Sequence, residues 1–286
     1  MFVASSPPAS SSCAVPGAVE VTDLVTHYGD RLILDDVSFS VRQGEIMVIM
    51  GGSGSGKSTL LRYLLGLHRP TRGHIRLLGE DITQLDSAAL YALRGRMGVS
   101  FQGGALFNSM TVGENVELPL REHTGLDDNT IRIMANLKLE LVNLAGFGHL
   151  MPAQLSGGMV KRAALARAIV MDPKLLFFDE PSAGLDPVAA AELDELIIRL
   201  RDVMGTTIVV VTHELQSAFK IADRITVLDH GRILAVGSVE EIRQSPIPRI
   251  RDLLNRRPRN EQVDPEAYMD RLTQSGGSAS GPVSTP

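Results

Sequence analysis

The sequence contains no tryptophan and only one cysteine, Cys13, among its 286 residues. A single thiol excludes an internal disulfide and a cysteine-rich metal cluster, and it fits a reducing compartment. No apolar run approaches the ~18 residues that span a bilayer, so we expect no membrane-spanning helix. The N-terminus lacks the basic residues and the long apolar stretch of a secretory signal, so we expect no such signal.

Positive charge is also in short supply. The chain carries 28 Lys and Arg against 33 Asp and Glu, which gives a net charge of −5 at pH 7. This balance argues against a protein that coats nucleic acid with its whole surface, and we predict no nucleic-acid partner. Hydrophobic residues make up 44% of the chain and charged residues 21%, which is typical of a globular protein with a large core.

The two ends of the chain differ in composition from its middle. Residues 1–17 are rich in Ala, Ser and Pro and are predicted to form a disordered arm. A folded domain is predicted over 18–245, with a more helical insert at about 103–165. Residues 246–286 are predicted to be a C-terminal extension that is disordered in part, because its end consists largely of Gly, Ser and Pro.

Strand-like and helix-like patterns alternate in the middle of the chain. Short apolar runs that end at polar residues predict buried strands at 46–50, 175–178 and 208–211. Fully apolar strands are typical of a parallel sheet that helices cover on both faces. The sequence therefore predicts an α/β core.

Two helices are predicted from apolar spacing and from capping residues. Asp186 is a suitable N-cap and Pro187 suits the first helical position, and the apolar spacing that follows stops at Gly205. The second helical pattern is predicted to stop near Gly146. Its apolar residues are Met134, Leu137, Leu141 and Leu144.

A glycine-rich segment separates the first predicted strand from an apolar helix. Residues 51–58 read GGSGSGKS, which fits G-x-x-x-x-G-K-[ST]. Glycines let backbone N–H groups surround a phosphate chain, Lys57 can reach the β- and γ-phosphates, and the Ser58 hydroxyl can bind Mg²⁺. The alternative is a glycine-rich linker. The predicted phosphate-binding residues are Gly51, Gly52, Ser53, Gly54, Ser55, Gly56, Lys57, Ser58 and Thr59.

Two acids stand at the end of a predicted strand. Asp179 and Glu180 follow the apolar run 175–178. In a phosphate-loop fold this is where a strand delivers an Asp to the magnesium shell. Glu180, one residue further, is placed to polarise an attacking water. Two solvated acids at a strand end are the alternative interpretation.

Further motifs occur in a fixed order along the chain. They are Tyr28 before the first core strand, Gln102, Leu155-Ser-Gly-Gly-Met159, Ser182-Ala-Gly-Leu-Asp186 and Thr212-His213. Together with the phosphate loop and the acid pair, this set resembles the nucleotide-binding subunit of an ABC transporter over about residues 18–240. The resemblance implies an α/β fold: a P-loop NTPase (RecA-like) core, a small antiparallel β subdomain and an α-helical subdomain that carries the signature motif.

The resemblance also implies the cofactors ATP and Mg²⁺ and a role for each matching residue. Tyr28 resembles the aromatic residue that stacks on adenine, against the alternative of a half-buried strand aromatic. The implied catalytic residues are Glu180, His213 and Gln102, and the implied metal ligands are Ser58, Gln102 and Asp179. His213 resembles the residue that hydrogen-bonds the γ-phosphate; a structural histidine is the alternative.

The signature residues imply a second copy of the chain. Ser156, Gly157 and Gly158 stand at a helix start, where free N–H groups attract anions. In this family the anion is the γ-phosphate of ATP that the other subunit holds, and Asp186 can bridge the two subunits. The chain is therefore expected to form a head-to-tail dimer with closed two-fold symmetry around two ATP molecules.

Two longer runs, 101–120 and 155–168, resemble the ATPases of lipid-trafficking systems built around MCE proteins, the Mla type. That resemblance implies an inner-membrane permease dimer, an MCE-domain lipid-binding protein, in some systems a small STAS-domain protein, and a place on the cytoplasmic face of the inner membrane. The cargo would be phospholipid or a related hydrophobic molecule. The alternative is an importer of amino acids or other small solutes. Met159, where Gln is commonest, and Glu214, where Asp is frequent, depart from the superfamily pattern without removing a phosphate ligand.

Two other classes compete with a transporter ATPase. A soluble member that acts in translation or repair should carry two cassettes or a long heptad region, and neither pattern is present. A non-hydrolysing scaffold should lack the acid or the switch residue, yet both Glu180 and His213 are there. The apolar run 105–107 predicts either a permease contact or core packing. The role of a C-terminal arginine cluster is left open: Arg249, Arg251, Arg256, Arg257 and Arg259.

Overall fold

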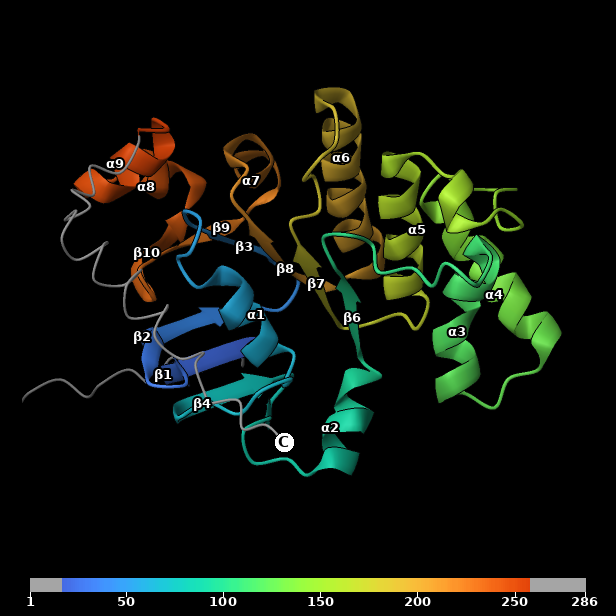
Figure 1. Ribbon diagram of the computed structural model, residues 1–286, viewed down its shortest axis with the longest axis horizontal. Coiled ribbons are helices and arrows are strands. Elements are labelled where there is room, and N and C mark those ends of the chain that lie inside the picture. Colours follow the sequence, from blue (N-terminus) through green and yellow to red (C-terminus); the bar gives the residue numbers. More distant parts are fainter. Residues whose placement is uncertain (1–16, 258–286) are drawn as a thin grey trace, which may run out of the picture.

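The computed structural model describes residues 17–257 of the chain (Figure 1). The predicted N-terminal arm, apart from its last residue, lies outside this range, and so does Arg259. The described chain forms a four-stranded sheet in the order β2-β1-β4-β5 and a six-stranded sheet in the order β10-β9-β3-β8-β7-β6. The strands are β1 Val19–Tyr28, β2 Arg31–Val41, β3 Ile46–Met50, β4 Arg72–Leu77, β5 Glu80–Asp81, β6 Met97–Ser100, β7 Leu175–Asp179, β8 Thr207–Thr212, β9 Arg224–Asp229 and β10 Arg232–Ser238.

Helices surround the larger sheet (Figure 1). They are α1 Lys57–Leu64, α2 Ser87–Arg94, α3 Val112–His123, α4 Asp128–Leu141, the short 3-10 helix η1 Pro152–Gln154, α5 Gly157–Ile169, α6 Pro187–Met204, α7 Leu215–Ile221, α8 Val239–Arg243 and α9 Pro248–Leu254. Among these described helices none is both long enough and apolar enough to cross a membrane.

The central strands of the larger sheet run parallel. β3 pairs with β8 and β9, and β7 pairs with β6 and β8, all in parallel register. Met50 lies opposite Thr212, and Asp179 lies opposite Val211. The strands therefore end together, and the segments that follow them meet at one edge of the sheet. The three predicted buried strands are confirmed as β3, β7 and β8.

Alternate residues of β3 belong to different cores. Ile46, Val48 and Met50 pack with residues of α5, α6 and α7, whereas Met47 and Ile49 pack with α1 and the four-stranded sheet. Successive side chains of a strand point to opposite faces, so a strand covered on both faces must be apolar throughout. This covering explains the unbroken apolar run from which β3 was predicted.

The helix predicted after Asp186 is confirmed. The Asp186 carboxylate accepts hydrogen bonds of 3.0 Å from the backbone N–H groups of Val188 and Ala189, and Pro187 opens α6. Gly205 ends the helix with a positive φ of 60°, a conformation that glycine adopts without strain.

The end predicted for the other helix was wrong. α4 stops at Leu141 instead of continuing to the neighbourhood of Gly146. Asn143 has a φ of 60°, a left-handed conformation that ends a helix. The chain then turns back, so Leu144 is buried in the core although it lies outside the helix, whereas Leu137 is 58% exposed on α4.

Helices α3, α4 and α5 pack against one another at one side of the larger sheet (Figure 1).

At the C-terminal end of the described chain, Ile250 of α9 is completely buried in the core. Two arginines of the C-terminal cluster are held there: Arg249 donates to Asp229 at 2.8 Å, and Arg251 donates to the Ser245 carbonyl at 3.1 Å. The proposed boundaries of the helical part and of the 18–245 domain stay predictions.

The contact between α6 and α7 encloses a carboxyl group. Asp194 of α6 is 4% exposed, and its Oδ1 has no hydrogen-bond partner among the described residues. Burial raises the pKa of this carboxyl; the nearby Ser217 hydroxyl and the charge of Lys220 lower it in part, and Glu195 raises it further. A raised pKa means that folding disfavours the ionised form.

We expect the Asp194→Asn variant to melt at a higher temperature than the wild type at pH 7.5. The folded pKa of Asp194 lies above its unfolded value, so the wild type loses stability as the pH rises from the unfolded to the folded pKa. An amide does not ionise, so the gain should shrink as the pH of the comparison is lowered toward the ordinary pKa of an aspartate. Asp202→Asn, on the exposed end of α6, is the control and should show no such gain. A variant that is less stable at pH 7.5 would contradict the prediction.

Candidate nucleotide site

The phosphate loop 51–58 joins the end of β3 to the start of α1. Lys57 is 8% exposed, and its Nζ donates to the carbonyl oxygens of Gly51 at 2.8 Å and Gly52 at 3.0 Å. Burial lowers the pKa of Lys57, while the charges of Glu180 and Asp179 act in the opposite direction. The lysine ammonium is thus held within the loop, with two acids close enough to influence it.

Two glycines of this loop have no room for a side chain. A Cβ on Gly51 would lie 2.1 Å from the Leu228 carbonyl oxygen. Gly56 has a φ of 104°, and a Cβ there would lie 2.8 Å from Leu34. The loop is therefore seated directly on β9 and β2. Ser53, Gly54 and Ser58 are exposed, Gly52 and Thr59 are half-buried, and Ser55 is buried.

Asp179 presents a buried oxygen at the end of β7. Its Oδ1 has no hydrogen-bond partner in the part of the chain that the structure describes. Burial and the charge of Glu180 raise the pKa of this carboxyl, against the charges of Arg62, Lys57 and Lys161. A carboxylate in this condition gains from a nearby cation.

Glu180 and His213 are in direct contact. Glu180 is 8% exposed, and its Oε1 lies 2.8 Å from the Nδ1 of His213. The other oxygen accepts from the Thr212 hydroxyl at 2.9 Å and from the backbone N–H of His213 at 3.3 Å. The φ of Glu180 is 48°, a left-handed conformation that is uncommon for a residue with a side chain. The ends of β7 and β8 thus position these two residues together.

The remaining predicted residues lie elsewhere. Tyr28, at the end of β1, is 81% exposed, which differs from the half-buried aromatic weighed as its alternative. Ser156 caps α5 and accepts from the Met159 N–H at 3.3 Å, and Gly157 beside it is exposed. The buried residues of α1 and α5 pack on opposite faces of the larger sheet. The helix that carries the signature segment and the helix that follows the phosphate loop therefore lie on opposite faces of that sheet.

Gln102 is exposed in the loop after β6, and a residue that the sequence analysis missed holds its backbone. Lys161 of α5 donates to the carbonyl of Gln102 and, at 3.3 Å, to the carbonyl of Glu180. A signal was present in the sequence. Lys161 is in line with Leu165 and Ala168 on the buried side of an alanine-rich helix, where a basic residue needs a partner.

A family model described as "ABC transporter" matches residues 34–183, more than half of the chain. The chain belongs to the ABC transporter family. This membership confirms the predicted family, fold class and ATPase activity.

Members of the family with similar sequences include two MlaF proteins, each named an intermembrane phospholipid transport system ATP-binding protein. The chain is 44% identical to that of Haemophilus influenzae over 79% of its own length and 86% of the relative. It is 43% identical to that of Escherichia coli over 85% and 90%. A probable ribonucleotide transport ATP-binding protein, mkl of Mycobacterium leprae, is 42% identical over 84% of this chain and 69% of the relative.

Solved structures of the family have the same fold. The dimeric post-hydrolysis state of the ATP-binding cassette MJ0796, bound to ADP and Pi, matches with a TM-score of 0.70 and 32% identity over 77% of this chain and 98% of that one. CbiO1 from Clostridium perfringens, part of the ABC transporter complex cbiONQ, matches with a TM-score of 0.75 and 27% identity over 90% and 99%.

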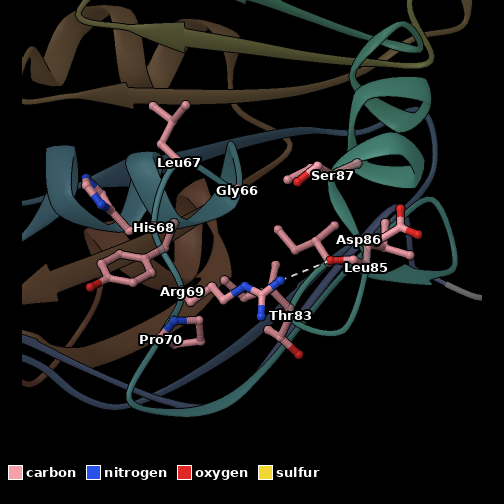
Figure 2. Close-up of a pocket in the computed structure, with 13 residues that line it drawn as sticks. Gly66, Leu67, His68, Arg69, Pro70, Thr83, Leu85, Asp86 and Ser87 are labelled. Atoms are coloured by element: carbon pink, nitrogen blue, oxygen red, sulfur yellow. Dashed lines mark hydrogen bonds between the residues drawn. The ribbon is translucent and has the colours of Figure 1, made fainter.

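A pocket of about 210 Å³ opens away from this edge of the ABC fold, between the end of α1 and the segment before α2 (Figure 2). Arg69 crosses it and donates to the Leu85 carbonyl at 3.3 Å, as the dashed line in Figure 2 shows. Its lining includes none of the residues predicted to bind nucleotide or metal. The candidate nucleotide site is therefore the carboxyl edge of the sheet and not this pocket.

Proposed function

We propose that the chain is the ATP-hydrolysing, nucleotide-binding subunit of an inner-membrane ABC transporter that moves phospholipid between the inner and outer membranes. The observation that carries the hydrolytic part is the meeting of the phosphate loop, the buried Asp179 and the Glu180–His213 pair at one sheet edge. The identity of more than 40% to two phospholipid-transport ATP-binding proteins supports the cargo.

The phosphate loop binds the β- and γ-phosphates of ATP. The backbone N–H groups of 51–56 and the N-terminus of α1 supply partial positive charge, and Lys57 supplies a full one. Its ammonium exchanges the carbonyl oxygens of Gly51 and Gly52 for phosphate oxygens. Tyr28, exposed at the end of β1, offers its ring to the adenine base.

Magnesium accompanies the phosphates, and the residues fit it. Mg²⁺ prefers oxygen ligands and keeps several waters, so it needs few protein groups. Asp179 has a buried oxygen without a partner among the described residues, and Ser58 is exposed at the start of α1. We assign the ion to Ser58, Asp179 and the side chain of Gln102, where it would neutralise charge on the phosphates.

Glu180 orients and polarises the water that attacks the γ-phosphate. Its carboxylate is fixed by Thr212 and His213, and Glu180 directly follows Asp179, the residue assigned to the metal. His213 keeps 55% of its side chain exposed and can direct its other ring nitrogen to the γ-phosphate. In both residues the functional group is already held before a substrate enters.

The site is completed by a second copy of the chain. Ser156 and the N–H groups of Gly157 and Gly158 form the anion-binding start of α5, and this helix packs on the face of the larger sheet opposite to α1, the helix that follows the phosphate loop. In a head-to-tail dimer they bind the γ-phosphate held by the partner, with Asp186 at the junction. Two matched cassette structures, both of MJ0796, are dimers.

The other proposed partners are a permease dimer, an MCE-domain lipid-binding protein and, in some systems, a small STAS-domain protein, with the chain on the cytoplasmic face of the inner membrane. The loop after β6 is the proposed permease contact. Leu106 packs against the core, which fits core packing, while Phe107 is 51% exposed and leaves an apolar side chain available for the permease.

Purification of the tagged chain from detergent-solubilised membranes, followed by mass spectrometry, tests the cargo. We expect a permease and an MCE protein to be recovered with it. Recovery of a permease with a soluble solute-binding protein would favour a small-solute importer instead. Recovery without any membrane protein would overturn the transporter assignment.

A further inference from the structure

Helix α5 does more than carry the signature segment, because two of its cations hold the loop that follows β6. Lys161 donates to the carbonyl of Gln102. Further along the helix, Arg167 donates to the carbonyls of Gly104 and Ala105 at 2.8 and 2.7 Å. Three backbone carbonyl oxygens within four residues of this loop therefore accept hydrogen bonds from side chains of one helix.

Lys161 differs from Arg167 in having a second partner. Its Nζ also lies 3.3 Å from the carbonyl oxygen of Glu180. Only 9% of Lys161 is exposed. Burial lowers the pKa of the ammonium, while the charges of Asp179 and Glu180 raise it. One buried cation thus joins α5, the loop of Gln102 and the residue that activates water.

We propose that Lys161 is a positioning residue of the hydrolysis site, which ties the backbone of Glu180 and the loop of Gln102 to helix α5. This inference rests on the proposed function. The Glu180 backbone is left-handed, with a φ of 48°, and its N–H donates to Val211 at 2.8 Å. Lys161 holds the carbonyl on the other side of the same residue, so the backbone of Glu180 is fixed on both sides of the carboxylate-bearing carbon.

The tie has a consequence for kinetics. Lys161 acts through backbone oxygens of Gln102 and Glu180, while the hydrogen bonds that Lys57 makes within the phosphate loop go to Gly51 and Gly52. Its loss should therefore disturb the geometry of water attack more than the binding of ATP. A displacement of the loop would also reach Glu180 through one side chain, which gives a permease bound at this loop a short route to the catalytic carboxylate.

The test compares Lys161→Met with Lys161→Arg in steady-state ATP hydrolysis by the full-length chain. Loss of charged hydrogen bonds should lower kcat by about tenfold or more and leave KM for ATP within about threefold. Arg retains the charge and the donors, so it should recover most of kcat. Arg162→Met is the matched control, because Arg162 is the next residue of α5 and pairs with Glu192 instead. It should stay within about twofold of the wild type.

Different outcomes separate this inference from the function on which it rests. A wild-type chain that hydrolyses no ATP would overturn the proposed function. A normal wild type with an unchanged Lys161→Met kcat, or with a raised KM alone, would overturn the role of Lys161. If Lys161→Met does not fold, Lys161→Gln replaces it: an amide can serve one carbonyl but carries no charge, so kcat should still fall, and equal kcat for Gln and Arg would overturn the inference.

Discussion

Glu180→Gln is expected to bind ATP and to lose hydrolysis by about 100-fold or more, the usual contribution of a general base. The amide is close in shape to the carboxylate and can still accept from Thr212 and from the His213 N–H, so the local structure should persist. What it loses is the negative charge that polarises water. With Mg-ATP the variant should accumulate a closed dimer on gel filtration, because hydrolysis no longer opens the pair.

Glu214→Gln is the matched control for this experiment. Glu214 directly follows His213, and its Oε1 lies 3.8 Å from the Nε2 of that histidine. Its removal changes the local charge in the same way without touching the water-activating position. Turnover at the wild-type rate in Glu180→Gln, or an equal loss in Glu214→Gln, would rule out the role assigned to Glu180.

Lys57→Ala is expected to weaken ATP binding by about tenfold or more, since hydrogen bonds between charged groups contribute about 1.5–3 kcal/mol each. The substitution removes the positive charge that faces the phosphates. It also leaves the carbonyl oxygens of Gly51 and Gly52 without their present donor, so the loop loses part of its internal support.

Nucleotide affinity is the quantity to measure for Lys57, by equilibrium titration of the purified chain with a fluorescent ATP analogue. Lys220→Ala serves as the control, because Lys220 is a surface lysine of α7 that donates to Ala191 and Glu195. It should bind the analogue as tightly as the wild type. An unchanged affinity in Lys57→Ala would contradict the placement of ATP on this loop.

Much of the fold could be predicted because its strongest signals are local. β3 is apolar at every position because both of its faces are covered. The two ends of α6 could be predicted because Asp186 caps its start and Gly205 ends it. The phosphate loop could be read in the same way. Gly51 and Gly56 have no space for a Cβ, so the glycines of the motif stand where the fold of the loop requires them.

The features that were missed depend on partners far away in the chain. The carbonyls that Lys161 contacts belong to residues 59 positions before it and 19 positions after it, and a backbone oxygen leaves no mark on the sequence. The end of α4 depended on the left-handed backbone of Asn143, which the apolar spacing does not record. The buried carboxyl of Asp194 arises only when α6 and α7 are packed together.

The placement of α1 and α5 on opposite faces of one sheet has a genetic consequence. If each ATP is enclosed by the phosphate loop of one chain and the signature helix of another, each site contains residues of both chains. A defective chain then also inactivates a site to which its normal partner contributes. Cells that produce both kinds of chain should lose transport out of proportion to the defective fraction. Substitutions in either half-site are therefore expected to be dominant-negative, and a lesion that prevents pairing altogether should be recessive.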